Sequence, residues 1–141
     1  MSFELDPQLA KDSELVCDFE ISQVRLILDC QYPWCLLVPR INDVTELSDL
    51  PYATYIQVCS ESNQLSLAMQ AVFTPDKMNI ASIGNMVKQL HIHHVARYTD
   101  DVAWPKPVWG FAPMQAYSKN ELQKRSQALI AQIQSQLKDI E

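Results

Sequence analysis

The chain has 141 residues, of which 48% are apolar and 20% are charged, and its formal net charge is −6. This length and composition predict a single packed globular domain over residues 1–141 and exclude a disordered or collagen-like chain. The acidic balance argues against binding to nucleic acid, which relies on clustered Lys and Arg, but it does not exclude a small phosphorylated ligand.

The sequence contains no apolar run of the roughly 18 residues that a membrane span needs. Met1–Asp6 also lacks the basic and then apolar pattern of a signal peptide. We therefore expect a cytoplasmic protein with no membrane partner. The four cysteines form no C-x-x-C pair, which favours reduced structural thiols over a disulfide or zinc framework.

Two strands and a long helix are predicted in the first half of the chain. Val24–Leu28 is apolar and β-branched, and Trp34–Val38 is an apolar run closed by Pro39, so the pair resembles an antiparallel hairpin. From Asp49 to Phe73, apolar residues recur mostly at spacings of three and four, which predicts an amphipathic helix of about six turns with Pro51 in its first turn. Its apolar positions are Tyr52, Tyr55, Ile56, Cys59, Leu65, Ala68, Met69, Val72 and Phe73.

Two further strands and a last helix are predicted in the second half. The strands are Lys77–Ile83 and Gln89–Arg97, and a loop with Trp and Pro follows at Asp100–Gly110. A helix over about residues 118–137 begins at a capping box, Ser118-Lys119-Asn120-Glu121. Strands joined by short connections, with only two helices, favour an α+β fold with an antiparallel sheet.

All three histidines lie close together on one of these strands. Because side chains alternate along a strand, Gln89, His91 and His93 share one face, while His94 points to the other, where packing or solvent exposure is its simplest role. Two imidazoles at i and i+2 lie about 7 Å apart along the strand, within reach of one ligand. A pair of titratable rings on one face favours ligand binding or proton transfer near neutral pH.

Two other interpretations of the histidine pair remain open. His91 and His93 could be partly buried strand residues that bond to backbone carbonyls. They could also begin a zinc site, but no further ligand follows at a recognised spacing, and Asp100 and Asp101 would serve only if the chain folded back.

The segment Gly84–Arg97, followed by Trp104–Gly110, resembles the histidine triad (HIT) superfamily, and more narrowly its bacterial members labelled diadenosine-tetraphosphate-hydrolase-like. The likeness covers about residues 17–110 and leaves the last helix outside. It implies a HIT-like fold, an antiparallel sheet of about five strands with a long middle helix and a C-terminal helix. It also implies a homodimer that extends the sheet, and no cofactor or metal.

The resemblance assigns a mechanism to the histidines. In the family pattern H-x-H-x-H, His91 matches the middle histidine, which attacks the α-phosphate of a nucleotide and forms a covalent nucleotidyl-histidine that water hydrolyses. His93 matches the third histidine, and Gln89 stands where the first would be, which implies positioning rather than proton transfer. Met86 stands where many members have a serine that contacts the leaving group.

The resemblance favours Asn79 and Asn85 as substrate-binding residues, and Gly84 and Trp104 are further candidates from the residues themselves. The amides, backbone N–H groups near Gly84 and a protonated His93 would stabilise charge on the phosphate oxygens. Either Trp104 or Trp109 could stack on a base, or both could pin their loop to the core. The expected substrates are dinucleoside polyphosphates or nucleoside phosphoramidates, and the alternative is a nucleotide-binding module with little turnover.

Overall fold

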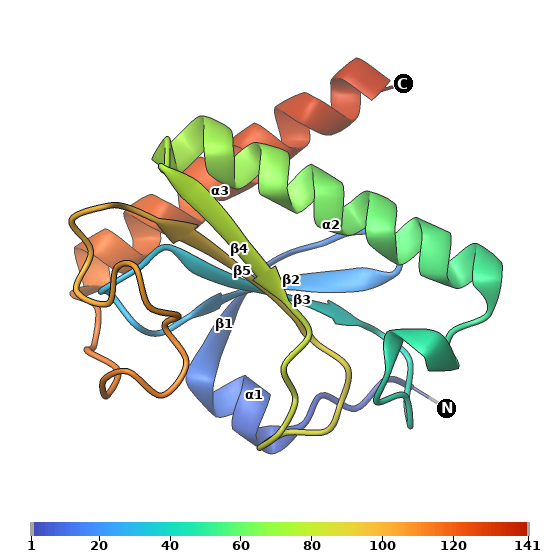
Figure 1. The fold of residues 1–141 in the computed structure, drawn as a ribbon. Coiled ribbons are helices and arrows are strands. Elements are labelled where there is room, and N and C mark those ends of the chain that lie inside the picture. The colour runs from blue at the N-terminus through green and yellow to red at the C-terminus, as the bar shows by residue number, and fades with distance from the viewer. Residues whose placement is uncertain (1, 141) are drawn as a thin grey trace.

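A computed structural model describes residues 2–140 and contains, within that range, three α-helices, one short 3-10 helix and five strands (Figure 1). The helices are α1 (Pro7–Asp12), α2 (Tyr52–Phe73) and α3 (Lys119–Ile140), with the 3-10 helix η1 at Leu47–Asp49. The strands are β1 (Ser13–Asp18), β2 (Ser22–Ile27), β3 (Trp34–Pro39), β4 (Lys77–Ala81) and β5 (Ile92–Arg97).

The five strands form one sheet in the order β1-β2-β3-β5-β4, and every neighbouring pair is antiparallel. The predicted α+β fold, with about five strands, a long middle helix and a C-terminal helix, is therefore confirmed. Strand β5 lies between β3 and β4, so both of its edges are hydrogen-bonded and its side chains are fixed in register.

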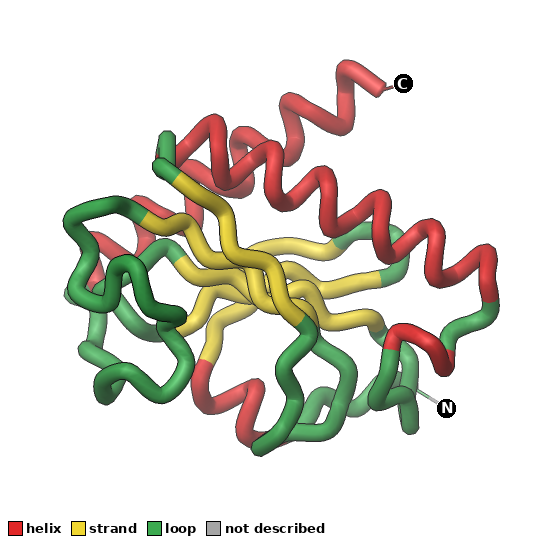
Figure 2. Tube along the Cα trace, in the orientation of Figure 1, coloured by secondary structure: helices red, strands yellow, loops and turns green. Residues whose placement is uncertain are grey.

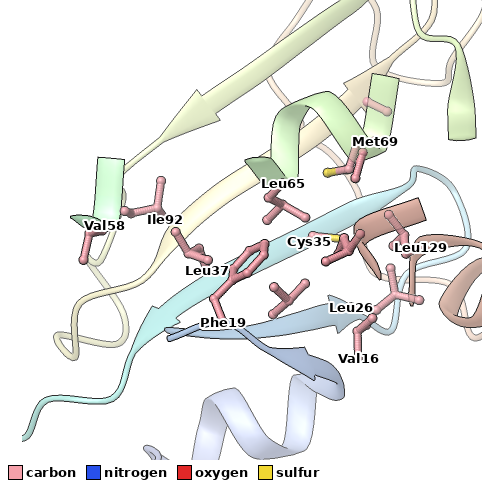
Figure 3. Close-up of a cluster of buried hydrophobic side chains, with 14 of the residues drawn as sticks. Val16, Phe19, Leu26, Cys35, Leu37, Val58, Leu65, Met69, Ile92 and Leu129 are labelled. Atoms are coloured by element: carbon pink, nitrogen blue, oxygen red, sulfur yellow. The ribbon is translucent and has the colours of Figure 1, made fainter. Parts of the chain in front are cut away.

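Helices α2 and α3 cover one face of the sheet, and the other face carries α1 and the long loops (Figure 2). The core between the sheet and the two helices contains Leu26, Leu37 and Ile92 from the strands, with Leu65 and Met69 from α2 and Leu129 from α3 (Figure 3). A second apolar cluster on the opposite face includes Leu9, Trp34, Leu36 and Val108. Strand β3 is buried on both faces, which explains why its sequence is a continuous apolar run.

The predicted elements end within a few residues of those in the structure. Two elements of the structure, however, have no counterpart in the prediction. Helix α1 and strand β1 were not predicted, because neither carries a clear apolar period, although Leu9 and Val16 reach the two cores. Helix α3 begins as predicted, with the Ser118 hydroxyl accepting from the Glu121 N–H at 3.2 Å.

The predicted buried face of α2 was wrong in its first half. Tyr52, Tyr55, Ile56 and Cys59 are exposed, and this half of the helix instead buries Val58 and Glu61. In the second half Leu65, Ala68 and Met69 are buried as predicted, together with Ser66. The carboxylate of Glu61 turns inward because it accepts the backbone N–H of Ile21 at 2.9 Å. Tertiary contacts of this kind override an apolar period read from the sequence. Within residues 2–140, no helix has the length and apolarity needed to cross a membrane.

Candidate functional site

The histidines lie where β5 begins, and the alternation of side chains places them as predicted, although the strand is shorter than predicted. It starts at Ile92 rather than Gln89, because the Leu90 N–H bonds to the Val44 carbonyl instead of joining the sheet. His91 and His93 point to the same side, with ring centroids 4.9 Å apart. Strand β4 likewise ends at Ala81, opposite His93, instead of at Ile83.

His91 is held in one orientation by its own backbone. Its Nδ1 lies 2.7 Å from the carbonyl oxygen of Gln89, and since a carbonyl only accepts, Nδ1 carries the proton. In the neutral form of the ring the lone pair is therefore on Nε2, which has no hydrogen-bond partner among residues 2–140. The side chain is nearly buried, so the ring is presented to a cavity rather than to bulk water.

His93 has a partner at each ring nitrogen. The indole N–H of Trp34 donates to Nδ1 at 3.0 Å, and Nε2 donates to the carbonyl of Ile83 at 3.1 Å. Burial, reinforced by the neighbouring His91, lowers the pKa of His93 to about 4. His93 is thus neutral near pH 7, and no N–H is left to meet a phosphate, unlike the protonated His93 considered from the sequence.

His94 lies on the opposite side of β5 and is fully buried between the sheet and α2. Its Nδ1 donates to the Ile92 carbonyl at 3.1 Å, so Nε2 accepts the Ser62 hydroxyl at 2.7 Å. Burial lowers the pKa of His94 to about 4. Of the two roles suggested by the sequence, packing is the one that the structure supports.

The side chain of Gln89 binds the N-terminal segment. Its Oε1 accepts the Asp6 N–H at 2.9 Å, and its Nε2 donates to the Glu4 carbonyl at 2.9 Å. Both ends of the amide are occupied, so Gln89 reaches His91 through its backbone carbonyl and not through its side chain. The positioning role of Gln89 stays a prediction.

Two cavities meet at His91. One, of about 620 Å³, is mostly apolar, and its walls include Leu9, Trp34, Met86, His93 and Trp109. The other, of about 500 Å³, is polar and is lined by Thr45, Glu46, Ser82, Gly84, Asn85, Lys88, Gln89, Leu90 and His91. Asn85 and His91 line both, which places His91 at the junction of an apolar and a polar compartment.

Gly84 is required by space in the connection between β4 and β5. A Cβ at this position would lie 2.7 Å from the Val87 carbonyl oxygen and 3.7 Å from Cε1 of His91. The first distance is shorter than a side chain tolerates. The absence of a side chain thus lets the turn 84–87 fold tightly beside His91.

Asn79 and Trp104, which the resemblance placed at the substrate, lie around Arg97 instead. The Asn79 amide oxygen accepts from Nη1 of Arg97 at 2.8 Å, and the Trp104 ring lies 5.6 Å from the guanidinium carbon. Asp101 completes this buried cluster with an ion pair to Arg97 at 2.8 Å. Neither Asn79 nor Trp104 lines either of the two cavities at His91.

Two other tryptophans stand beside the histidines. Trp109 comes from the loop after β5, and its ring centroid lies 5.2 Å from that of His93. Trp34 comes from β3 and was not singled out as a site residue, because the partner of a side chain across a sheet is not encoded locally. The register of β3 against β5, which sets Leu36 opposite His93 and Trp34 opposite Val95, is what brings Trp34 to the histidine, and the sequence carries no local signal for it.

Among residues 2–140 there is no group of three or more His, Cys, Asp or Glu side chains that could hold a metal ion. Within this range His91 and His93 are therefore not joined by a third side chain of these types. What the arrangement offers is one oriented imidazole, that of His91, at the border of an apolar and a polar cavity.

Comparisons with known proteins bear on the fold and the family of the chain. A family model described as the HIT domain matches residues 8–100. A crystal structure of a histidine triad protein from Bradyrhizobium japonicum aligns with a TM-score of 0.92 and 40% identity, covering 94% of this chain and 99% of that chain. One from Marinobacter aquaeolei aligns with a TM-score of 0.92 and 37% identity, covering 96% and 98%.

A histidine triad protein from Sinorhizobium meliloti is similar too, with a TM-score of 0.90 and 31% identity over 92% of this chain and 96% of that chain. The search of curated proteins gave no match. The family model covers more than half of the chain, and these three relatives each exceed 30% identity over nearly their whole length. The chain therefore belongs to the HIT domain family.

Proposed function

We propose that this protein is a metal-independent nucleotide hydrolase or nucleotidyl transferase of the diadenosine-tetraphosphate-hydrolase-like type. Its substrates would be dinucleoside polyphosphates or nucleoside phosphoramidates, and the reaction would pass through a covalent nucleotidyl group on His91. The observation that carries this proposal is the orientation of His91. Its Nδ1–H is bonded to the Gln89 carbonyl, and Nε2 stands open where the two cavities meet.

The first chemical step is attack of the Nε2 lone pair on the α-phosphorus. A P–N bond forms, and the bond from phosphorus to the leaving group breaks, with its electron pair departing on that group. The His91 ring then carries a positive charge, which the Gln89 carbonyl stabilises through the Nδ1–H. A water molecule next attacks phosphorus and forms a P–O bond, while the P–N bond breaks and its electron pair returns to Nε2. The proton that the attacking water loses passes to the surrounding solvent.

The two cavities match the two halves of such a substrate. The apolar one, with Leu9, Trp34 and Trp109 in its walls, has the size and lining expected for a base and ribose. The polar one, which contains Lys88 and Ser82, suits a hydrated and charged leaving group. Asn85, which lines both cavities, and the backbone near Gly84 are the groups we assign to the phosphate oxygens.

A nucleotide-binding module with little turnover is the second candidate, and two observations favour it. The Gln89 amide is engaged with Glu4 and Asp6, and both nitrogens of His93 are engaged with other protein groups. No acid is therefore aimed at the leaving group from these two triad positions. Met86, at the family's serine position, is 96% exposed and adds no polar contact.

The proposed enzyme would act as a homodimer. Strand β4 forms one edge of the sheet, where Ile80 is 50% exposed, and the outer side of α2 exposes Tyr52, Ile56 and Leu67. Apolar side chains at an edge strand and an adjacent helix suit association with a second copy of the chain. Light scattering of wild type and of Ile56→Lys tests this, with the exposed α3 substitution Gln127→Lys as control. A monomeric wild type would contradict it.

Intact-mass measurement tests the enzyme directly. Wild type, His91→Ala and the control Lys124→Ala, an exposed position on α3, are each incubated briefly with diadenosine tetraphosphate and with an adenosine phosphoramidate, and the products are followed in parallel. An adenylyl adduct or AMP release in wild type and Lys124→Ala, but not in His91→Ala, supports the enzyme. Binding of AMP without adduct or product supports the binding module, and turnover that survives in His91→Ala contradicts the mechanism.

A further inference from the structure

The contact between Trp34 and His93 joins two strands that neighbour each other in the sheet. Trp34 begins β3, His93 lies within β5, and 59 positions separate them in the sequence. The indole Nε1 lies 3.0 Å from Nδ1 of His93, and both side chains are more than nine-tenths buried. The contact is therefore fixed by the register of the sheet and not by a mobile surface side chain.

The chemistry of the two partners specifies where the proton of His93 lies. An indole nitrogen only donates, so Nδ1 must be the acceptor and carries no proton. A carbonyl only accepts, so Nε2, at 3.1 Å from the Ile83 oxygen, must carry it. A second proton on Nδ1 would face the indole N–H and remove that hydrogen bond. Both contacts thus select one neutral form of the ring.

The other groups around His93 do not supply a competing partner. The ionisable side chains facing the same cavity are His91, Asp12 and Asp29, and His94 lies across the strand. Asp29 accepts the backbone N–H of Gln31 at 3.0 Å, and His91 bonds to the Gln89 carbonyl. The Trp109 ring packs against the His93 ring in a T-shaped arrangement and makes no hydrogen bond to it.

We propose that Trp34 is a positioning residue that holds His93 as the Nε2–H form, so that His93 delivers no proton and the site favours leaving groups that depart unprotonated. The preference for such leaving groups rests on the proposed attack by His91. Of the two candidate substrate classes, this preference selects the dinucleoside polyphosphate over the nucleoside phosphoramidate.

The selection follows from the electron balance of the bond that breaks. When a phosphoanhydride P–O bond breaks, the electron pair stays on a phosphate oxygen, which is stable as an anion and needs no proton. When a phosphoramidate P–N bond breaks, the pair stays on nitrogen, which departs only if it gains a proton. The Nε2–H of His93 is hydrogen-bonded to the Ile83 carbonyl and does not reach the leaving group. Cleavage of the P–N bond would therefore depend on water alone for the proton that the nitrogen needs.

Nitrogen-15 NMR of the histidine rings tests the role of Trp34 without any turnover. Wild type is expected to show His93 protonated at Nε2 only, with no titration between pH 8 and pH 5.5. In Trp34→Phe the ring is kept and the donor is lost, so the ratio of Nε2–H to Nδ1–H forms should fall about fivefold, the effect of losing one neutral hydrogen bond. The pKa of His93 should also rise in Trp34→Phe, because the lost hydrogen bond stabilises only the neutral ring.

Trp109→Phe is the matched control, because it changes an aromatic neighbour of His93 but removes no hydrogen bond from the ring. It should leave the tautomer of His93 unchanged. Wild-type His93 carrying its proton on Nδ1, or titrating near its ordinary pKa, would overturn the proposal even if Trp34→Phe failed to fold. An equal tautomer shift in both variants would also overturn it.

The substrate preference is tested by kcat/KM of wild type for diadenosine tetraphosphate and for an adenosine phosphoramidate across the same pH range. We expect the polyphosphate to be preferred at pH 8 by at least about tenfold, and the preference to narrow as the pH falls and water supplies protons more readily. Preference for the phosphoramidate would refute the selection. If neither substrate turns over, the proposed enzyme fails and the selection with it, while the NMR result still decides the role of Trp34.

Discussion

The buried pair of Arg97 and Asp101 is where one substitution should do most damage without touching His91. The Arg97 and Asp101 side chains are 1% and 3% exposed. The Asp101 carboxylate accepts Nε of Arg97 at 2.8 Å and Nη2 at 3.0 Å, and it also accepts the backbone N–H groups of Tyr98 and Trp104. This one carboxylate therefore ties β5 to the loop that carries Trp109.

In Asp101→Asn the side chain keeps its shape but loses its charge, and its NH₂ group must face a donor. Breaking one side of a buried ion pair leaves an uncompensated charge and costs about 3–5 kcal/mol. Asn79 and the Lys106 carbonyl still accept from Arg97, so we expect the lower end, about 3 kcal/mol. At roughly 3 °C per kcal/mol, Tm should fall by about 10 °C.

Urea unfolding followed by tryptophan fluorescence measures this free energy at pH 7.5. Asp100→Asn is the matched control, because Asp100 is the exposed neighbour in the same loop and should change the free energy of unfolding by less than about 0.5 kcal/mol. In the double variant Arg97→Met/Asp101→Leu, where no lone charge remains, part of the stability should return. If Asp101→Asn and Asp100→Asn unfolded at the same urea concentration, the buried pair would not stabilise this loop.

Two further predictions concern pH and the turn beside His91. Burial holds the pKa of both His93 and His94 at about 4, below the ordinary 6.5, so the unfolded chain binds protons that the folded chain does not. The free energy of unfolding should be level above about pH 7 and fall as the pH drops from 6.5 to 4, by about 3 kcal/mol per histidine at most. Burial alone would raise the pKa of Asp101, but Arg97 and the backbone N–H groups lower it overall, so its stabilisation is lost only at still lower pH. Equal urea midpoints at pH 7.5 and pH 5 would contradict the histidine effect. In Gly84→Ala the new Cβ meets the Val87 carbonyl at 2.7 Å, so the turn must shift and AMP binding by calorimetry should weaken at least about tenfold. Gly110 is the comparison, because it has a positive φ but open space around it, so Gly110→Ala should instead lower the free energy of unfolding by about 1 kcal/mol. Unchanged AMP affinity in Gly84→Ala would argue against the assigned phosphate position.

The sequence by itself determined the features that depend on local periodicity. Alternation along a strand placed His91 and His93 on one face and His94 on the other, whatever the rest of the chain did. The apolar run of β3 and the Ser118 cap at the start of α3 were equally local, and both were correct, although only the Ser118 half of the predicted capping box forms. The family resemblance then supplied the fold, because it rested on the same histidine segment.

Only the tertiary structure decided which groups those side chains meet. Trp34 reaches His93 because β3 pairs with β5, and Asn79 reaches Arg97 because β4 lies on the other side of β5. Gln89 binds a segment more than 80 residues earlier in the chain. Such contacts depend on the order of strands and on the path of connecting segments, which are set by burial over the whole domain and leave no local period in the sequence.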